Sequence, residues 1–66
     1  MEIVLNGQSK SLDGPQNVAG LIESLGFAGK RIAVERNGEI VPKSAYTQTM
    51  IKPGDRLEIV VAVGGG

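Results

Sequence analysis

The sequence predicts a two-layer α+β domain, in which one helix covers one face of a β-sheet. Three observations lead to this fold class. Apolar and polar residues alternate with a period of two near the start, in the middle and at the end of the chain. One short segment has helical spacing, and Asn-Gly pairs stand where antiparallel strands would turn. With 66 residues, the chain is near the lower limit for independent folding.

The first predicted element is a β-hairpin. Residues 2–5 (Glu-Ile-Val-Leu) form a short β-type run, Asn6-Gly7 is a strong turn signal, and residues 10–12 return as the second strand. Asp13-Gly14-Pro15 then ends the hairpin.

A short amphipathic helix follows. Its apolar residues fall at i, i+3, i+4 and i+7: Val18, Leu21, Ile22 and Leu25. Asn17 is placed to cap the helix, because its side chain can accept a hydrogen bond from a free backbone N–H. Gly26 supplies the left-handed residue that commonly ends a helix.

A second hairpin comes next. Residues 31–36 alternate like a strand, Asn37-Gly38 turns the chain, and residues 39–41 return. Pro42 ends that strand, since it has no N–H to donate. We expect an irregular segment after it, with one short helical turn around Ala45-Tyr46.

The last predicted strand covers residues 56–63 and follows a tight turn at Pro53-Gly54-Asp55. Asp55 is interpreted as a turn residue rather than a catalytic acid. Period-two alternation assigns these strand residues to the core, beside the apolar stripe of the helix: Ile3, Leu5, Ile32, Val34, Leu57, Ile59 and Val61.

The same alternation leaves an apolar patch on the opposite sheet face. Its members point outward beside Glu2, Glu35 and Glu58: Val4, Ala33, Val60 and Ala62. An open sheet face is normally polar, so we predict that partners bind at Val4, Val60 and Ala62. The alternative is that scattered surface valines carry no function.

Composition excludes several classes of function. The chain has no Cys and no His, which removes a thiol nucleophile, the usual general base and the commonest metal ligands. Seven basic and seven acidic residues balance, and there are only two aromatic residues, which argues against nucleic-acid binding. No run is long enough to cross a bilayer. We therefore expect a cytoplasmic non-enzyme with no metal or bound cofactor, which acts on other proteins.

Basic side chains near the helix end give no phosphate-binding motif. Residues 26–31 have the wrong spacing for a phosphate loop, and we interpret Lys30 and Arg31 as solvated cations near the negative end of the helix dipole. Lys43 and Arg56 could reach an acidic partner, although surface solubility is the preferred interpretation.

Three glycines, Gly64-Gly65-Gly66, follow the most apolar strand. Glycine has no side chain to pack, so this segment could pass through a channel that is too narrow for other residues. A carboxylate on Gly66 is a poor acyl donor until ATP converts it to an acyl-adenylate, and a sulfur nucleophile could then displace AMP. A partner enzyme must supply that machinery. The alternative is a flexible tail without function.

These motifs resemble the bacterial sulfur-carrier proteins of thiamin thiazole synthesis, the ThiS family. The resemblance spans the chain and rests on the element order, Asn6-Gly7, residues 17–22, 40–43 and 53–59, and the glycine terminus. It implies a ubiquitin-like β-grasp fold, with a mixed sheet of about five strands and one main helix packed on one face. It also implies one domain over residues 1–66, with a flexible tail at 63–66.

The resemblance further implies a chemistry for the chain end. Gly66 would be adenylated by an E1-like adenylyltransferase (ThiF-like) that uses ATP, then converted to a thiocarboxylate with sulfur from a persulfide enzyme. A thiazole synthase (ThiG-like) would accept that sulfur. Gly65 matches the second residue of the family's diglycine, and Gly64 a more variable position; the carrier would be a monomer when free.

Two other functions stay open at this point. One is a sulfur carrier for molybdopterin synthesis, which has a similar fold and tail. The other is a ubiquitin-like modifier or docking module, either conjugated to lysines or bound through its sheet face.

Overall fold

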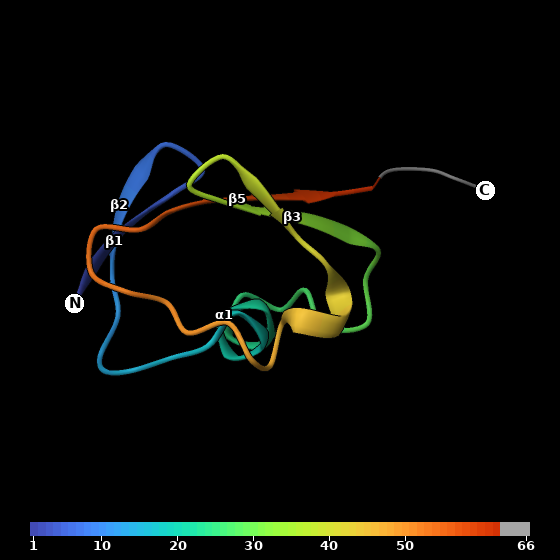
Figure 1. Ribbon diagram of the computed structural model, residues 1–66, viewed down its shortest axis with the longest axis horizontal. Coiled ribbons are helices and arrows are strands. Elements are labelled where there is room, and N and C mark those ends of the chain that lie inside the picture. The colour runs from blue at the N-terminus through green and yellow to red at the C-terminus, as the bar shows by residue number, and fades with distance from the viewer. Residues whose placement is uncertain (63–66) are drawn as a thin grey trace.

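One helix lies against one face of a five-stranded sheet in the computed structural model, which describes residues 1–62 (Figure 1). The helix is α1 (Val18–Ser24), and a single 3₁₀ turn, η1, covers Lys43–Ala45. The strands are β1 (Glu2–Leu5), β2 (Gln8–Ser11), β3 (Ile32–Arg36), β4 (Glu39–Val41) and β5 (Arg56–Val61).

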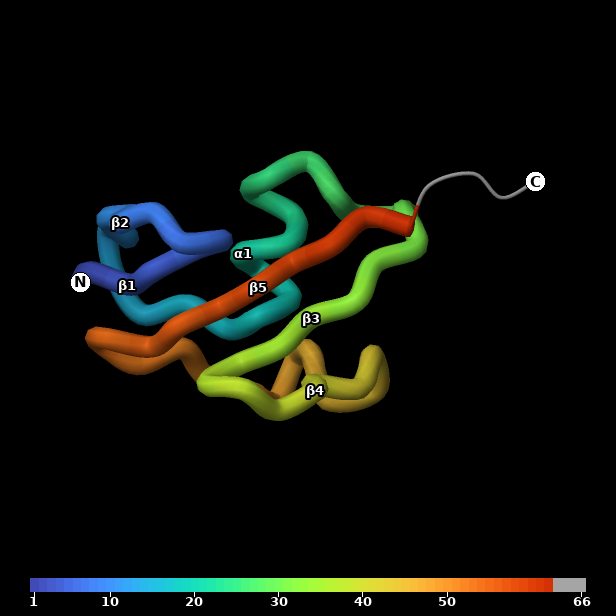
Figure 2. Tube along the Cα trace, turned by 90° about the horizontal axis from the view of Figure 1, so that it is seen from above, coloured from blue at the N-terminus to red at the C-terminus, as the bar shows by residue number. Residues whose placement is uncertain are grey.

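The last strand of the chain lies in the centre of the sheet. The strand order is β2-β1-β5-β3-β4, and β5 runs parallel to β1 but antiparallel to β3 (Figure 2). The predicted β-grasp fold is therefore confirmed.

Both predicted hairpin turns are confirmed by their backbone angles. Asn6 and Gly7 have φ of 50° and 82°, and Asn37 and Gly38 have φ of 52° and 86°. Positive φ at both central residues is the two-residue turn that matches the twist of paired strands. The second strand was predicted at residues 10–12, and this prediction is wrong at its start. The two-residue turn pairs Gln8 with Leu5, so β2 begins at Gln8 rather than at Lys10.

The helix begins and ends where the sequence predicts. The backbone N–H of Gly20 donates to Asn17 Oδ1 at 2.7 Å, and Gly26 has φ of 80°. The expected helical turn near Ala45 is η1. Strand β5 ends at Val61, and Val63, which was expected within it, lies outside the described residues.

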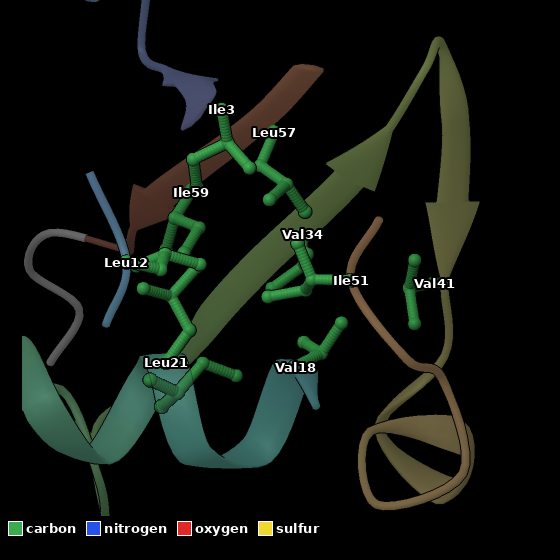
Figure 3. Close-up of a cluster of buried hydrophobic side chains, with 10 residues drawn as sticks. Ile3, Leu12, Val18, Leu21, Val34, Val41, Ile51, Leu57 and Ile59 are labelled. Carbon is green, nitrogen blue, oxygen red and sulfur yellow. The ribbon is translucent and has the colours of Figure 1, made fainter. Parts of the chain in front are cut away.

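The core lies between α1 and the sheet (Figure 3). Ile3, Leu21 and Leu57 are almost fully buried, as predicted, while Leu5, Leu25 and Ile32 are half-buried against the core. Three further buried residues were not predicted, because they lie at or beyond strand ends where no period marks them: Leu12, Val41 and Ile51.

Asn6 extends the pairing of β1 with β5 through its side chain. Its backbone N–H donates to the Leu57 carbonyl at 2.9 Å. Its Nδ2 donates to the Ile59 carbonyl at 3.2 Å, while Oδ1 accepts from the Ile59 N–H at 2.8 Å. The side-chain amide of Asn6 thus makes the two hydrogen bonds to β5 that the backbone of a further β1 residue would make, at the point where β1 ends.

Asn6→Gly should therefore lower the free energy of unfolding by about 1–2 kcal/mol, because it removes both side-chain bonds. Glycine accepts positive φ, so the turn itself is retained. Urea unfolding checks this prediction, and an unchanged midpoint would show that the amide contributes nothing.

Candidate functional site: the outer sheet face and the end of β5

An apolar patch lies on the outer face where β5 ends. Val60 is 63% exposed and pairs in register with Ala33, which is also exposed. Ala62 follows on the same face of the chain and is exposed as well. We call Ala33, Val60 and Ala62 the β5-end patch. It borders the segment that leads to the glycines.

Val4 lies apart from this patch. It points to the outer face, as predicted, but it is half-buried and pairs with Arg56 at the start of β5. Val60 lies four positions along the strand from Arg56, or about 13 Å. The structure therefore brings Val60 and Ala62 together and places Val4 near the other end of the strand.

Ile40 is an exposed apolar residue of this face that the sequence reasoning did not select. It is 67% exposed on β4 and pairs with Glu35. Residues 39–41 were predicted as a strand, but no core face was assigned to that strand, so the sequence did not indicate that Ile40 faces outward.

Acidic residues adjoin the patch. Glu35 and Glu58 pair directly across β3 and β5, and Arg56 stands two residues before Glu58. With Asn37 and Gly38, they line a depression of about 440 Å³. Like charges directly opposite each other on adjacent strands are unfavourable.

Glu58→Lys should therefore raise the free energy of unfolding by about 0.5–1 kcal/mol, since it replaces a repulsive pair with an attractive one. Glu2→Lys is the matched control. It makes the same charge change on the same face, but Glu2 pairs with Ser11. Thermal unfolding of both variants at low salt measures the effect, and equal shifts would contradict it.

The three predicted tail residues, Gly64, Gly65 and Gly66, lie outside the described residues. The last described residue is held in place, because the Ala62 N–H donates to the Arg31 carbonyl at 2.8 Å. An extended chain spans about 3.3–3.6 Å per residue, so Gly66 can lie up to roughly 14 Å from Ala62.

Asp55 is a structural residue that directly precedes β5, at the opposite end of the strand from the β5-end patch. The residue is 7% exposed, and its carboxylate accepts from Arg36 Nε at 2.8 Å, Asn37 Nδ2 at 3.1 Å and the Lys52 N–H at 2.9 Å. Burial raises its pKa, but the bonds from Lys52, Arg36 and Asn37 and the Arg36 charge outweigh burial, so the pKa is lowered.

Within residues 1–62, no cluster of three or more acidic, Cys or His side chains could hold a metal ion. No helix in that same range is long and apolar enough to span a bilayer.

The ThiS family model matches residues 3–66, which is all but the first two residues of the chain. The chain belongs to the ThiS family. A solved ThiS structure supports the same fold: the thiamine biosynthesis protein ThiS of Geobacter metallireducens superimposes with a TM-score of 0.85 at 35% identity, with all of both chains covered.

Two curated relatives of this ThiS-family chain differ in length. The chain is 46% identical over all 66 residues to a thiazole synthase of Paramagnetospirillum magneticum, but it spans only 20% of that protein. It is 29% identical to the sulfur carrier protein ThiS of Escherichia coli, over the whole of both chains.

Proposed function

We propose that this chain is a sulfur carrier that delivers sulfur for the thiazole ring of thiamin, as a thiocarboxylate on Gly66. The observation that carries this proposal is the family match over residues 3–66. The whole-length similarity to the Escherichia coli sulfur carrier supports it.

The chemistry takes place at one carboxyl group. The Gly66 carboxylate, ionised at neutral pH, attacks the α-phosphorus of ATP and releases pyrophosphate, which gives an acyl-adenylate. The terminal sulfur of a persulfide attacks the acyl carbon and AMP leaves. A thiol then cleaves the resulting acyl disulfide, which frees the thiocarboxylate and forms a new disulfide.

The chain itself supplies presentation rather than catalysis. Strand β5 is paired on both sides and precedes the glycines in the sequence. Glycines have no Cβ, so an enzyme can close tightly around the reacting atoms. The β5-end patch is the proposed contact with the enzymes, because it includes Ala62, the last described residue before the glycines in the sequence.

Three enzymes are the proposed partners. An adenylyltransferase binds the ATP and performs activation, a persulfide enzyme provides the sulfur, and a thiazole synthase receives it. The similarity to part of a thiazole synthase supports the last partner. We place the reaction in the cytoplasm, where ATP is available.

Growth without thiamin tests the proposal. Bacteria that lack their own sulfur carrier should grow when given this chain ending at Gly66, together with its own adenylyltransferase and thiazole synthase. They should fail with a chain that lacks Gly66, or with one that has an uncleaved alanine after it. Normal growth with either altered chain, at equal protein levels, would refute the proposal.

A further inference from the structure

A cavity of about 520 Å³ opens on the helix side of the domain, between α1, the loop after it and η1. Its apolar lining includes Ile22, Phe27, Ile32 and Tyr46, all of which are partly or fully buried against the core. Three cations and one carboxylate also line it: Lys30, Arg31, Lys43 and Glu23. We call it the basic-rimmed cavity.

The cavity lies at the same end of the molecule as the last described residues. Arg31 lines it and also accepts the Ala62 N–H through its carbonyl at 2.8 Å. The loop between α1 and β3 runs beside the end of β5 in both views (Figures 1 and 2). A protein that binds the residues after Ala62 must therefore come close to this loop.

The charge at the cavity is uneven, although the chain as a whole is neutral. Lys30, Arg31 and Lys43 are all exposed, and Glu23 is the one acidic lining residue. In the part of the chain that the structure describes, the single salt bridge joins Arg36 to Asp55, so these three cations have no such partner there.

Apolar walls with a charged rim favour one kind of occupant. A volume of several hundred Å³ accommodates a large side chain or a small ligand. Aromatic-lined pockets of this type anchor one apolar side chain of a partner, while charges around them steer association. The complementary segment carries a large apolar residue flanked by Asp or Glu.

We propose that the basic-rimmed cavity binds such an acidic segment on the thiazole synthase. The choice of partner rests on the proposed function and on the thiazole synthase relative, in which a domain 46% identical to this chain forms part of the same protein. The cavity thus adds a second contact, beside the chain end, to the interface on the outer sheet face.

Charge reversal tests this proposal. The double variant Lys30→Glu, Lys43→Glu should bind the thiazole synthase of the same organism about tenfold more weakly, with a flatter salt dependence, in calorimetry. Lys52→Glu is the control, since Lys52 is exposed and does not line the cavity. Its affinity should change less than about twofold.

A second variant tests the apolar lining. Ala28 is exposed and lines the cavity, so Ala28→Trp should fill the cavity while leaving the core and the cations in place. It should weaken binding at both low and high salt. Unchanged affinity in the double variant and in Ala28→Trp, or weakening only toward the adenylyltransferase, would overturn the proposal.

Thiocarboxylate formation on the same variants separates this proposal from the proposed function. With saturating adenylyltransferase and sulfur donor, the cavity variants should be converted as fully as the unaltered chain. Full conversion with unaltered affinity refutes the cavity contact alone, whereas failure to convert the unaltered chain refutes the sulfur-carrier function.

Discussion

Gly65→Val should lower the rate of adenylation by about 100-fold or more. In the proposed reaction, a β-branched side chain one residue from the reacting carboxyl group would widen the chain where the adenylyltransferase closes around it. A displacement of the reacting atoms by about 1 Å is enough to cause a loss of this size. Pyrophosphate release under single-turnover conditions measures the rate.

Gly14→Val is the matched control for this substitution. A Cβ built on Gly14 meets no atom within 4 Å, and the backbone there is not in the left-handed region. Both variants should unfold at the temperature of the unaltered chain, and only Gly65→Val should lose activity. An adenylation rate for Gly65→Val within about threefold of normal would show that adenylation does not require a residue without a side chain at this position.

Asp55→Ala should lower the free energy of unfolding by about 3 kcal/mol. It leaves the donors on Arg36, Asn37 and Lys52 without their acceptor, and it disconnects the turn before β5 from the β3–β4 hairpin. A domain of this size has a total stability of only about 3–10 kcal/mol, so much of it would be lost.

Urea unfolding measures this loss, with Asp13→Ala as the control. Asp13 is exposed, and its substitution should change stability by less than about 0.5 kcal/mol. Equal midpoints for the two variants would contradict the structural role of Asp55.

The same carboxylate makes stability depend on pH. Because the pKa of Asp55 is lower in the folded chain than in the unfolded one, the unfolded chain binds the proton first as pH falls. The contribution of Asp55 is present in full above about pH 5 and declines below about pH 4, toward its folded pKa. Asp55→Asn should flatten the stability profile in that acidic window.

The sequence predicted the elements because the local signals in this chain agree with its tertiary structure. The two-residue turns at 6–7 and 37–38 require positive φ at both central residues, and Asn-Gly is a pair that adopts these angles readily. The helical stripe of residues 18–25 has one apolar side, so it can pack against only one face of a sheet. The mixed sheet, by contrast, followed from the family resemblance rather than from any local pattern.

Features made by residues distant in sequence were not predictable. Ile51 and Leu12 are buried in the core cluster, although their own segments show no period. Asp55 reads as a turn residue, and its bonds to Arg36 and Asn37 depend on β3 lying beside β5. The basic-rimmed cavity joins α1, the loop after it and η1, so Lys30 and Lys43 meet only in three dimensions.

The most direct test of the sulfur-carrier function is the mass of the intact chain. It is measured after incubation with ATP, the adenylyltransferase and a persulfide donor. For the proposed sulfur carrier, we expect that one oxygen is replaced by sulfur and that the change maps to Gly66 in the terminal peptide. An unchanged mass despite ATP consumption, or a protein adduct linked through lysine, would contradict it.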